Sequence, residues 1–234
     1  MRQRTKKSIF VIANGGSVAL EKQDLAKLKN RDTIACNGYY PNGKNMFGLD
    51  VTYYFIGDGR RLQREWGEWD VLENIKNTNA IFSFAGEFNM DFESLFKGAP
   101  NVTILPAQGK NDDPWNIEKG IYRKFPGRST STNVMVQIAF WLGYKKIYLL
   151  GHDLQKKYSG YFWQLKRLKF GKPKTDRPEY KVKNQMATWK HFKKRASDIG
   201  AEIITCTGKD YSRITRTGLF RYASFESALK ESEI

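Results

Sequence analysis

Short apolar runs recur along the chain and alternate with segments whose apolar residues are spaced as on one face of a helix. The runs are rich in Ile, Val and aromatic residues and have the length of ordinary strands. Glycine or polar residues close most of them, as expected where a strand gives way to a turn. The strands predicted in this way are Ser8–Ala13, Asp32–Cys36, Val51–Ile56, Ala80–Ala85, Val102–Leu105, Lys146–Leu150 and Glu202–Thr205.

Helical periodicity follows several of these runs. Apolar residues at Leu20, Leu25 and Leu28 predict one helix after the first strand. Gly143 is placed to end another, because glycine commonly follows the last turn of a helix. The remaining predicted helices are Trp66–Lys76, Thr132–Leu142, Lys183–Ile199 and Phe225–Lys230. Strands that alternate with helices predict a Rossmann-like α/β fold, a mostly parallel sheet with helices on both faces.

One long segment carries neither pattern. Between Gln155 and Val182 the chain contains Gly160, Pro173 and Pro178 among its lysines. Such a length is uncommon for a plain connection, so the segment is either a lid or a disordered insertion. We predict a single nucleotide-binding α/β domain over residues 1–234, with a basic lid inserted within 155–182.

Charge is concentrated in two places. The 234 residues include 40 Lys plus Arg and 24 Asp plus Glu, a net charge of +16. Fourteen basic and two acidic residues lie between Lys156 and Arg195, a local sum of +12, and the segment before Ser8 adds +4. The remainder is neutral. A basic segment that also contains aromatic residues predicts an anionic partner, either nucleic acid or a glycolipid at a membrane surface.

Composition excludes several classes of protein. An aromatic share of 14% argues against disorder. No apolar run is long enough to cross a bilayer, and Ile9–Ala13 is shorter than the core of a secretory signal, so we expect a cytoplasmic protein, or one peripheral to a membrane. Two cysteines and two histidines give no disulfide framework and no metal-ligand spacing, so we predict no metal site. The oligomeric state stays open, a homo-oligomer included.

Polar residues follow the predicted strands at their carboxyl ends, where ligands bind in open α/β sheets. They are Asn14, Asn37, Asp58 and Asp153. Gly15, Gly16 and Ser17 complete the first turn, whose backbone amides are candidates to bind a phosphate. Asp58 is a candidate to orient an acceptor hydroxyl. Asp153 is a candidate to accept from a ribose hydroxyl, or simply to cap the turn that follows it.

Two further segments carry candidate chemistry. Arg128 precedes four hydroxyl residues at the start of a predicted helix, among them Thr130 and Ser131. One hydroxyl suffices to cap a helix, so the set predicts an anion or nucleotide site as well. His152, between Gly151 and Asp153, is a candidate general base or a packing residue.

Several of these elements, in this order, resemble one group of enzymes. They are Ile12–Ser17, Cys36-Asn37, the strand leading to Asp58, Arg128–Ser131, Leu142–Leu149 and Gly151–Asp153. Together they resemble the bacterial lipooligosaccharide sialyltransferases, which use CMP-sialic acid. The same outline is similar to the MptE-like hydroxymethylpterin pyrophosphokinases. The resemblance extends roughly over residues 8–205 and is strongest from Arg128 to Asp153.

The resemblance to the sialyltransferases implies roles for individual residues. Asn14 and Ser17 are expected at the donor phosphate and sugar. The residues expected around the cytidine and its ribose are Asn37, Thr130, Ser131 and the Gly151–Asp153 turn. In the family's lid a tyrosine pair contacts the leaving phosphate, and a histidine base follows a tyrosine. Tyr161 matches one member of that pair, and Tyr180 lies in the nearest match to the base segment, which holds no histidine here.

The sequence therefore predicts a metal-independent glycosyltransferase without a further cofactor. It would move a sugar from a CMP-sugar-like nucleotide-sugar donor to a hydroxyl of an anionic acceptor. Tyr161 and Tyr180 are its predicted catalytic lid residues, and His152 or Asp58 its base. Two alternatives stay open: an MptE-like Mg²⁺-dependent pyrophosphokinase, which needs more than one well-placed acid, and a protein that binds or modifies nucleic acid through the basic segment 156–195.

Overall fold

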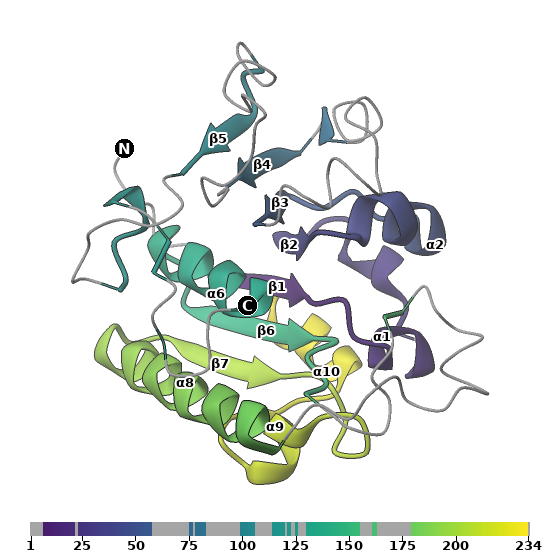
Figure 1. Ribbon diagram of the computed structural model, residues 1–234. Coiled ribbons are helices and arrows are strands. Elements are labelled where there is room, and N and C mark those ends of the chain that lie inside the picture. Colours follow the sequence, from purple (N-terminus) through teal and green to yellow (C-terminus); the bar gives the residue numbers. More distant parts are fainter. Residues whose placement is uncertain are drawn as a thin grey trace.

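The structure is a computed structural model. It describes residues 7–21, 23–57, 75–76, 78–82, 99–105, 114–119, 121–122, 125, 130–154, 161–162 and 179–233. Figure 1 shows the arrangement of these residues, a single sheet with helices packed against it.

The centre of the fold is a sheet that contains eight strands within the described residues, and every pair of neighbouring strands is parallel. Its order is β5-β4-β3-β2-β1-β6-β7-β8. The strands are β1 (Ser8–Ile12), β2 (Thr33–Cys36), β3 (Tyr53–Ile56), β4 (Asn79–Phe82), β5 (Val102–Ile104), β6 (Lys146–Leu150), β7 (Glu202–Thr205) and β8 (Arg221–Tyr222). The predicted parallel α/β architecture is confirmed, and each predicted strand is present with ends shifted by a few residues.

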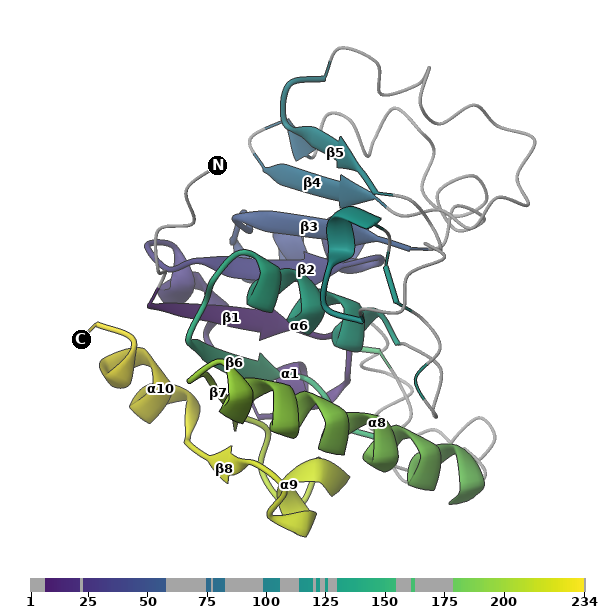
Figure 2. The ribbon, with the colours of Figure 1, turned by 90° about the vertical axis from the view of Figure 1, so that its left-hand side faces the viewer.

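Helices lie on both faces of this sheet. They are α1 (Ser17–Leu20), η1 (Leu25–Leu28), the π-helix η2 (Tyr39–Lys44), α2 (Asn45–Phe47), η4 (Ile117–Lys119), α6 (Ser131–Trp141), α8 (Glu179–Asp198), α9 (Arg213–Thr217) and α10 (Phe225–Glu231). One apolar cluster joins α6 and α8 to the sheet, and a second joins α1, η1 and α10 to the opposite face. Figure 2 shows α6 and α8 side by side on the first of these faces, and it places α10 on the same side of the molecule as the start of β1.

Alternation along β1 explains how one strand serves both clusters. Ile9 and Val11 belong to the cluster under α6 and α8, whereas Phe10 and Ile12 belong to the other. Successive side chains of a strand point to opposite faces. All four are fully buried because both faces of the sheet are covered. The continuous apolar run of the sequence therefore reports a strand that is covered on both sides.

Two predictions about helices are corrected. The single helix predicted through Leu28 is interrupted, because the chain leaves α1 at Glu21. Gln23 then turns inward and donates from Nε2 to the Cys206 carbonyl at 3.1 Å. This contact with the end of β7 outweighs the local periodicity. Elements not predicted at all are η2, α2, η4, α9 and β8. The helix predicted at Trp66–Lys76 lies outside the described residues except for its last two.

The lid predicted within 155–182 lies largely outside the described residues. Only the pair at 161–162 and the start of α8 are described. No helix in the described part of the chain is long and apolar enough to cross a membrane.

Candidate functional site

The order of the strands creates a switch point between β1 and β6. From β1 the chain adds β2 to β5 on one side, then returns and adds β6 to β8 on the other. Ligands of open α/β sheets bind at the carboxyl ends of the strands that flank such a point. The residues found there are Asn14 and Gly15 after β1, and Gly151 to Asp153 after β6. The predicted ligand edge of the sheet is thus also its topological switch point.

The two loops at the switch point are in direct contact. The Gly15 amide donates to the Gly151 carbonyl at 3.0 Å, which continues the β1–β6 ladder by one bond. A Cβ on Gly15 would lie 2.2 Å from that carbonyl oxygen and 2.6 Å from Cγ of Asp153. Gly151 has φ +66°, and a Cβ there would lie 2.5 Å from a methyl of Val18. Both glycines are required by the packing of one loop on the other.

Asp153 is a buried carboxylate that binds the first turn of α1. Oδ2 accepts from the Ser17 amide at 3.1 Å, and Oδ1 accepts from the Ser17 hydroxyl. Burial raises the pKa of Asp153 from 3.8 to about 6, while the hydrogen bonds from Ser17 and from the Gly16 amide oppose that rise. The carboxylate thus binds the start of α1, not the turn that follows Asp153, and its predicted contact with a ribose hydroxyl stays a prediction.

This contact corrects the predicted role of the turn amides. The Gly15 amide donates to Gly151, and the amides of Gly16 and Ser17 donate to Asp153. The three amides therefore have partners within the protein and are not directed at a ligand phosphate. Anionic Asp153 also offsets the positive end of α1, which has only four residues.

Asn14 and Asn37 each present one buried acceptor at this edge. Asn14 Nδ2 donates to the Cys36 carbonyl at 3.1 Å, and Asn37 Nδ2 donates to Ser131 Oγ at 2.7 Å. The Oδ1 atoms of both side chains are buried without a hydrogen-bond partner in the described part of the protein. A buried acceptor left in this state costs about 1–3 kcal/mol, which a bound donor group would recover.

The start of α6 adds a third such atom. Thr130 is the N-cap, and its backbone amide donates to Asn133 Oδ1 at 3.0 Å while the Asn133 amide donates to Thr130 Oγ1 at 3.3 Å. Asn133 is fully buried, and its Nδ2 has no partner among the described residues. Sequence reasoning missed Asn133. The available signal was its position three residues after a capping threonine.

The hydroxyl residues before α6 thus divide into two roles. Thr130 caps the helix, and Ser131 accepts from Asn37 and so joins α6 to the end of β2. Arg128 lies outside the described residues. So does Asp58, two positions after the end of β3.

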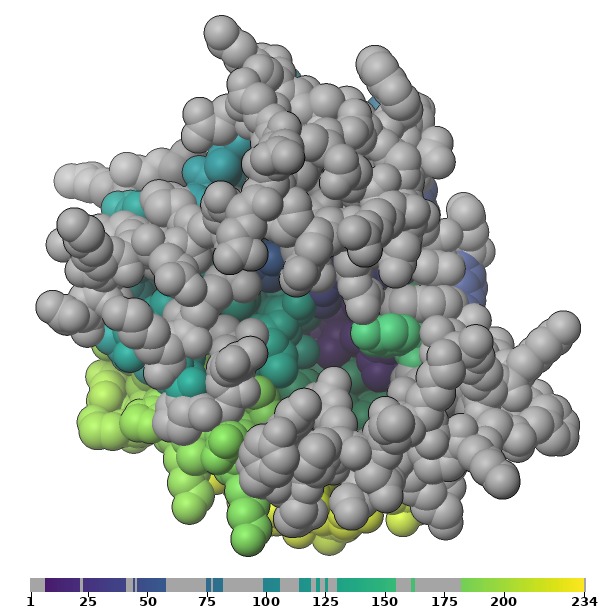
Figure 3. Space-filling view, in the orientation of Figure 1, coloured from purple at the N-terminus to yellow at the C-terminus, as the bar shows by residue number. Residues whose placement is uncertain are grey.

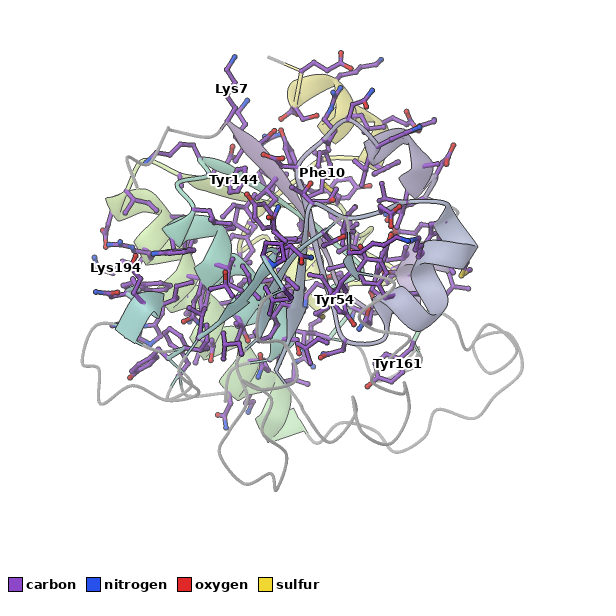
Figure 4. The ribbon with its side chains drawn as sticks, turned by 90° about the horizontal axis from the view of Figure 1, so that it is seen from above. Lys7, Phe10, Tyr54, Tyr144, Tyr161 and Lys194 are labelled. Carbon is purple, nitrogen blue, oxygen red and sulfur yellow. The ribbon has the colours of Figure 1, made fainter. Side chains whose placement is uncertain are left out.

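Tyr161 lies beside the loop that follows β1. It forms an antiparallel bridge with Gly15, and the next amide, that of Phe162, donates to the Asn14 carbonyl at 3.2 Å. Phe162 is fully buried and its ring centroid lies 5.1 Å from that of Phe47. Tyr161 itself is 37% exposed. In Figure 4 Tyr161 lies at the edge of the sheet opposite Lys7, which precedes β1. Figure 3 shows the green segment 161–162 beside the purple N-terminal part of the chain.

His152 lies in the interior rather than on the open edge. It is 6% exposed, and its ring packs edge to face on Trp189 of α8 at 4.9 Å between centroids. Its carbonyl accepts from Ser212 Oγ at 3.0 Å, and the Arg213 amide donates to the Asp153 carbonyl at 3.0 Å. The loop after β6 is therefore held by α1, α8 and α9 together. Tyr180 lies in the first turn of α8, where the structure describes the backbone alone.

No group of three or more His, Cys, Asp or Glu side chains within the described ranges is arranged to hold a metal ion. Cys36 and Cys206 are both buried as free thiols.

Solved structures provide the comparison with known proteins. No protein-family model matches the chain, and no curated protein matches it closely enough to count as a relative. The sialyltransferase CstII from Campylobacter jejuni, in complex with the substrate analogue CMP-3FNeuAc, is similar with a TM-score of 0.58 and 20% identity. The match covers 94% of this chain and 88% of that one.

Two further structures are similar over nearly the whole chain. The monofunctional α-2,3-sialyltransferase Cst-I from Campylobacter jejuni gives a TM-score of 0.57 at 22% identity, covering 96% of this chain and 82% of that one. A MAf glycosyltransferase from Magnetospirillum magneticum gives 0.57 at 14% identity, covering 100% of this chain and 37% of that one. The chain thus has the fold of the bacterial sialyltransferases, and the resemblance inferred from its ordered motifs is confirmed at the level of the fold.

Proposed function

We propose that this protein is a glycosyltransferase that uses a nucleotide-sugar donor of the CMP-sugar kind. It transfers the sugar to a hydroxyl of an anionic acceptor without a divalent ion or a further cofactor. The chain acts as one domain over 1–234, with 155–182 as its lid. Likeness to structures solved with CMP and with a donor analogue supports the class of donor.

One observation carries this proposal. Three side-chain amide atoms without partners among the described residues belong to the carboxyl edge of the sheet, in the loops after β1 and β2 and in the first turn of α6. They are Asn14 Oδ1, Asn37 Oδ1 and Asn133 Nδ2. Two acceptors and one donor complement a ligand rich in hydroxyl and amino donors. A nucleoside offers these as ribose hydroxyls and, in cytosine, an exocyclic amine.

The leaving phosphate needs charge stabilisation from another source, because the turn amides are engaged within the protein. Tyr161 is a described lid residue at this edge, bridged to Gly15. We assign its hydroxyl to the departing nucleotide phosphate, together with lysines of the lid. Fixed donors of this kind stabilise developing negative charge without a metal ion.

The acceptor hydroxyl must lose a proton as the new bond forms. Between the two predicted bases, His152 is buried against Trp189 and accordingly serves to hold the loop after β6. We therefore assign the base to Asp58, which comes two positions after the end of β3 in the sequence. Tyr180 is assigned to the part of the lid that contacts the acceptor.

Thermal shift measurements with CMP, UDP, GDP and ATP, each with and without Mg²⁺, test the donor class. A ligand that binds only the folded state raises stability by mass action, about 2.7 kcal/mol at one hundred times its dissociation constant. We expect selective stabilisation by CMP that EDTA does not remove. Stabilisation by ATP that requires Mg²⁺ would instead favour the pyrophosphokinase.

Two variants locate the binding site. Asn37→Ala removes an unpartnered acceptor at the site, whereas Asn79→Ala removes an exposed asparagine at the opposite end of the strands. By titration calorimetry we expect CMP affinity to fall at least tenfold in the first and to stay within twofold in the second. Equal affinities in both variants would contradict the proposed site, as long as each variant gives a cooperative melting transition.

A further inference from the structure

A groove lies between α8 and α9. Its volume is about 420 Å³. The lining side chains divide into an apolar and a cationic set. They are Val182, Met186, Ala187 and Leu219, then Lys183, Lys190 and Arg213, with Thr217 beside them. Figure 1 shows the two helices side by side, and Figure 2 shows the N-terminal half of α8 extending beyond the carboxyl ends of the strands.

The order of residues along α8 explains this division. Lys183 and Lys190 are seven positions apart and thus lie on one face, about 10 Å from each other along the axis. Met186 and Ala187 lie between them on the same face. The stripe is therefore apolar in its middle and cationic at both ends.

No acidic side chain from the described part of the chain lines the groove. Lys27, Arg31, Lys44, Lys194 and Arg221 form ion pairs within the described ranges, whereas Lys183 and Lys190 form none with a described residue. Lys183 and Lys190 accordingly carry charge that no described carboxylate neutralises. Uncompensated charge of one sign beside an apolar surface is complementary to an amphiphilic anion.

We propose that the α8–α9 groove binds the phosphate head of a phosphorylated lipid. The two lysines contact the phosphate, and Met186 and Leu219 cover the first methylenes or glycerol carbons behind it. Arg213 adds a guanidinium to the same groove, a group that favours phosphate oxygens. None of the three unpartnered asparagines lines this groove, and the lipid site goes beyond the proposed function.

The lining of the groove distinguishes a lipid phosphate from two other anions. Nucleic acid is bound by cations together with aromatic side chains on which bases stack, and none of the eight described lining residues is aromatic. Inorganic phosphate would leave the apolar half of the groove unused. A phosphorylated lipid has a phosphate and an apolar part, so it would occupy both the cationic and the apolar half of the groove.

Sedimentation with vesicles tests the proposal. The vesicles contain phosphatidylcholine alone, or phosphatidylcholine with one part in ten of phosphatidic acid. We expect binding to the second kind only. Glycerol 3-phosphate and a single-stranded oligonucleotide are then added as competitors at equal phosphate concentration. At a phosphate concentration equal to that of the lipid phosphate that binds the protein, neither competitor should displace the protein from the vesicles.

Matched variants on one helix separate the groove from general charge. Lys183→Gln with Lys190→Gln removes two charges from the groove, and Lys193→Gln with Lys194→Gln removes two from the exposed face of α8 outside it. We expect at least a tenfold loss of vesicle binding in the first pair and less than a threefold loss in the second. Met186→Gln, which keeps size and charge, should weaken binding at least threefold.

Three results would overturn the proposal. They are equal losses in the two lysine pairs, efficient displacement by either soluble competitor, and no effect of Met186→Gln. Titration of CMP against the same variants keeps the two proposals apart. If the protein binds vesicles but not CMP, the proposed donor is refuted and the proposed lipid site stands. If it binds CMP but not vesicles, only the proposed lipid site is refuted.

Discussion

The carboxylate of Asp153 accepts hydrogen bonds from both the amide and the hydroxyl of Ser17, although 136 positions separate the two residues. The contact fastens the loop after β6 to the first turn of α1. Since β1 and β6 are the two strands at the switch point, the contact between Asp153 and Ser17 fixes the relative position of the two loops at the candidate site.

Removing this carboxylate should destabilise the fold more than removing its hydroxyl partner. Asp153→Ala leaves the buried amides of Gly16 and Ser17 without an acceptor, and we expect a loss of about 2–3 kcal/mol. Ser17→Ala removes a single hydrogen bond and should cost about 1 kcal/mol. Urea unfolding followed by circular dichroism measures both. A reversed order would show that the hydroxyl, not the carboxylate, organises the loop.

Stability should fall as the pH rises from about 4 to 7. Burial raises the pKa of Asp153 to about 6 and that of Glu21 from 4.5 to about 7. An acid whose pKa is raised on folding binds more protons in the folded state, so its contribution is present at low pH and is lost as the pH passes the folded value. The midpoint of thermal unfolding at intervals of half a pH unit measures the slope. The hydrogen bond from Arg221 lowers the pKa of Glu231, so the contribution of Glu231 to the pH dependence has the opposite sign.

Glu21→Gln provides the control for that slope. The Glu21 carboxylate accepts from the Gly208 amide at 2.6 Å, and a glutamine oxygen preserves an acceptor there. We expect the variant to keep its stability at pH 5 and to lose less than the parent between pH 5 and 7. A slope unchanged by the substitution would assign the pH dependence to other groups.

Gly15→Ala should lower the stability of the protein far more than an alanine at a glycine with free space around it. The added Cβ would lie 2.2 Å from the Gly151 carbonyl, so one loop must move away from the other. Gly48 serves as comparison, because it has φ +62° and a Cβ there would meet no atom within 4 Å. Alanine at Gly48 should cost about 1 kcal/mol. Thermal unfolding measures the loss of stability in each variant. Equal losses would mean that the two loops can move apart at no cost in free energy.

Phe162 should hold Tyr161 in place beside Gly15. Its buried ring lies among Tyr39 and Phe47, and its amide donates to the Asn14 carbonyl. Phe162→Ala removes this anchor, and we expect the backbone amide at this position to exchange its hydrogen at least tenfold faster. Hydrogen exchange by mass spectrometry measures it. Unchanged protection would mean that the backbone bridge alone holds the segment.

The sheet and its ligand edge were predictable from the sequence because both depend on local signals. Apolar runs such as that of β6 mark buried strands, and polar residues such as Asn14 and Asn37 mark where two of them end. Helix α6 was likewise predicted within one residue at each end, since its apolar face, its capping threonine and its closing glycine all agree.

The roles of individual side chains were less predictable, because they depend on partners far along the chain. The turn at Gly16 looks the same in sequence whether its amide faces a phosphate or Asp153. Gln23 interrupts a helical pattern only because Cys206 offers it a carbonyl. His152 is indistinguishable from an exposed base until Trp189 is placed against it. Long-range contacts of this kind carry no local signature.

The position of β1 has a consequence for how the chain folds. Its residue Phe10 pairs with Thr33 on one side and with Tyr148 on the other. The first partner follows soon after β1 is synthesised, while the second emerges only when most of the chain has left the ribosome. Until then the central strand of the finished sheet is an edge strand, with an unpaired row of amides and carbonyls. Its exposure to wrong partners during synthesis lasts until β6 arrives, so completion of the core waits for a strand that begins only at Lys146.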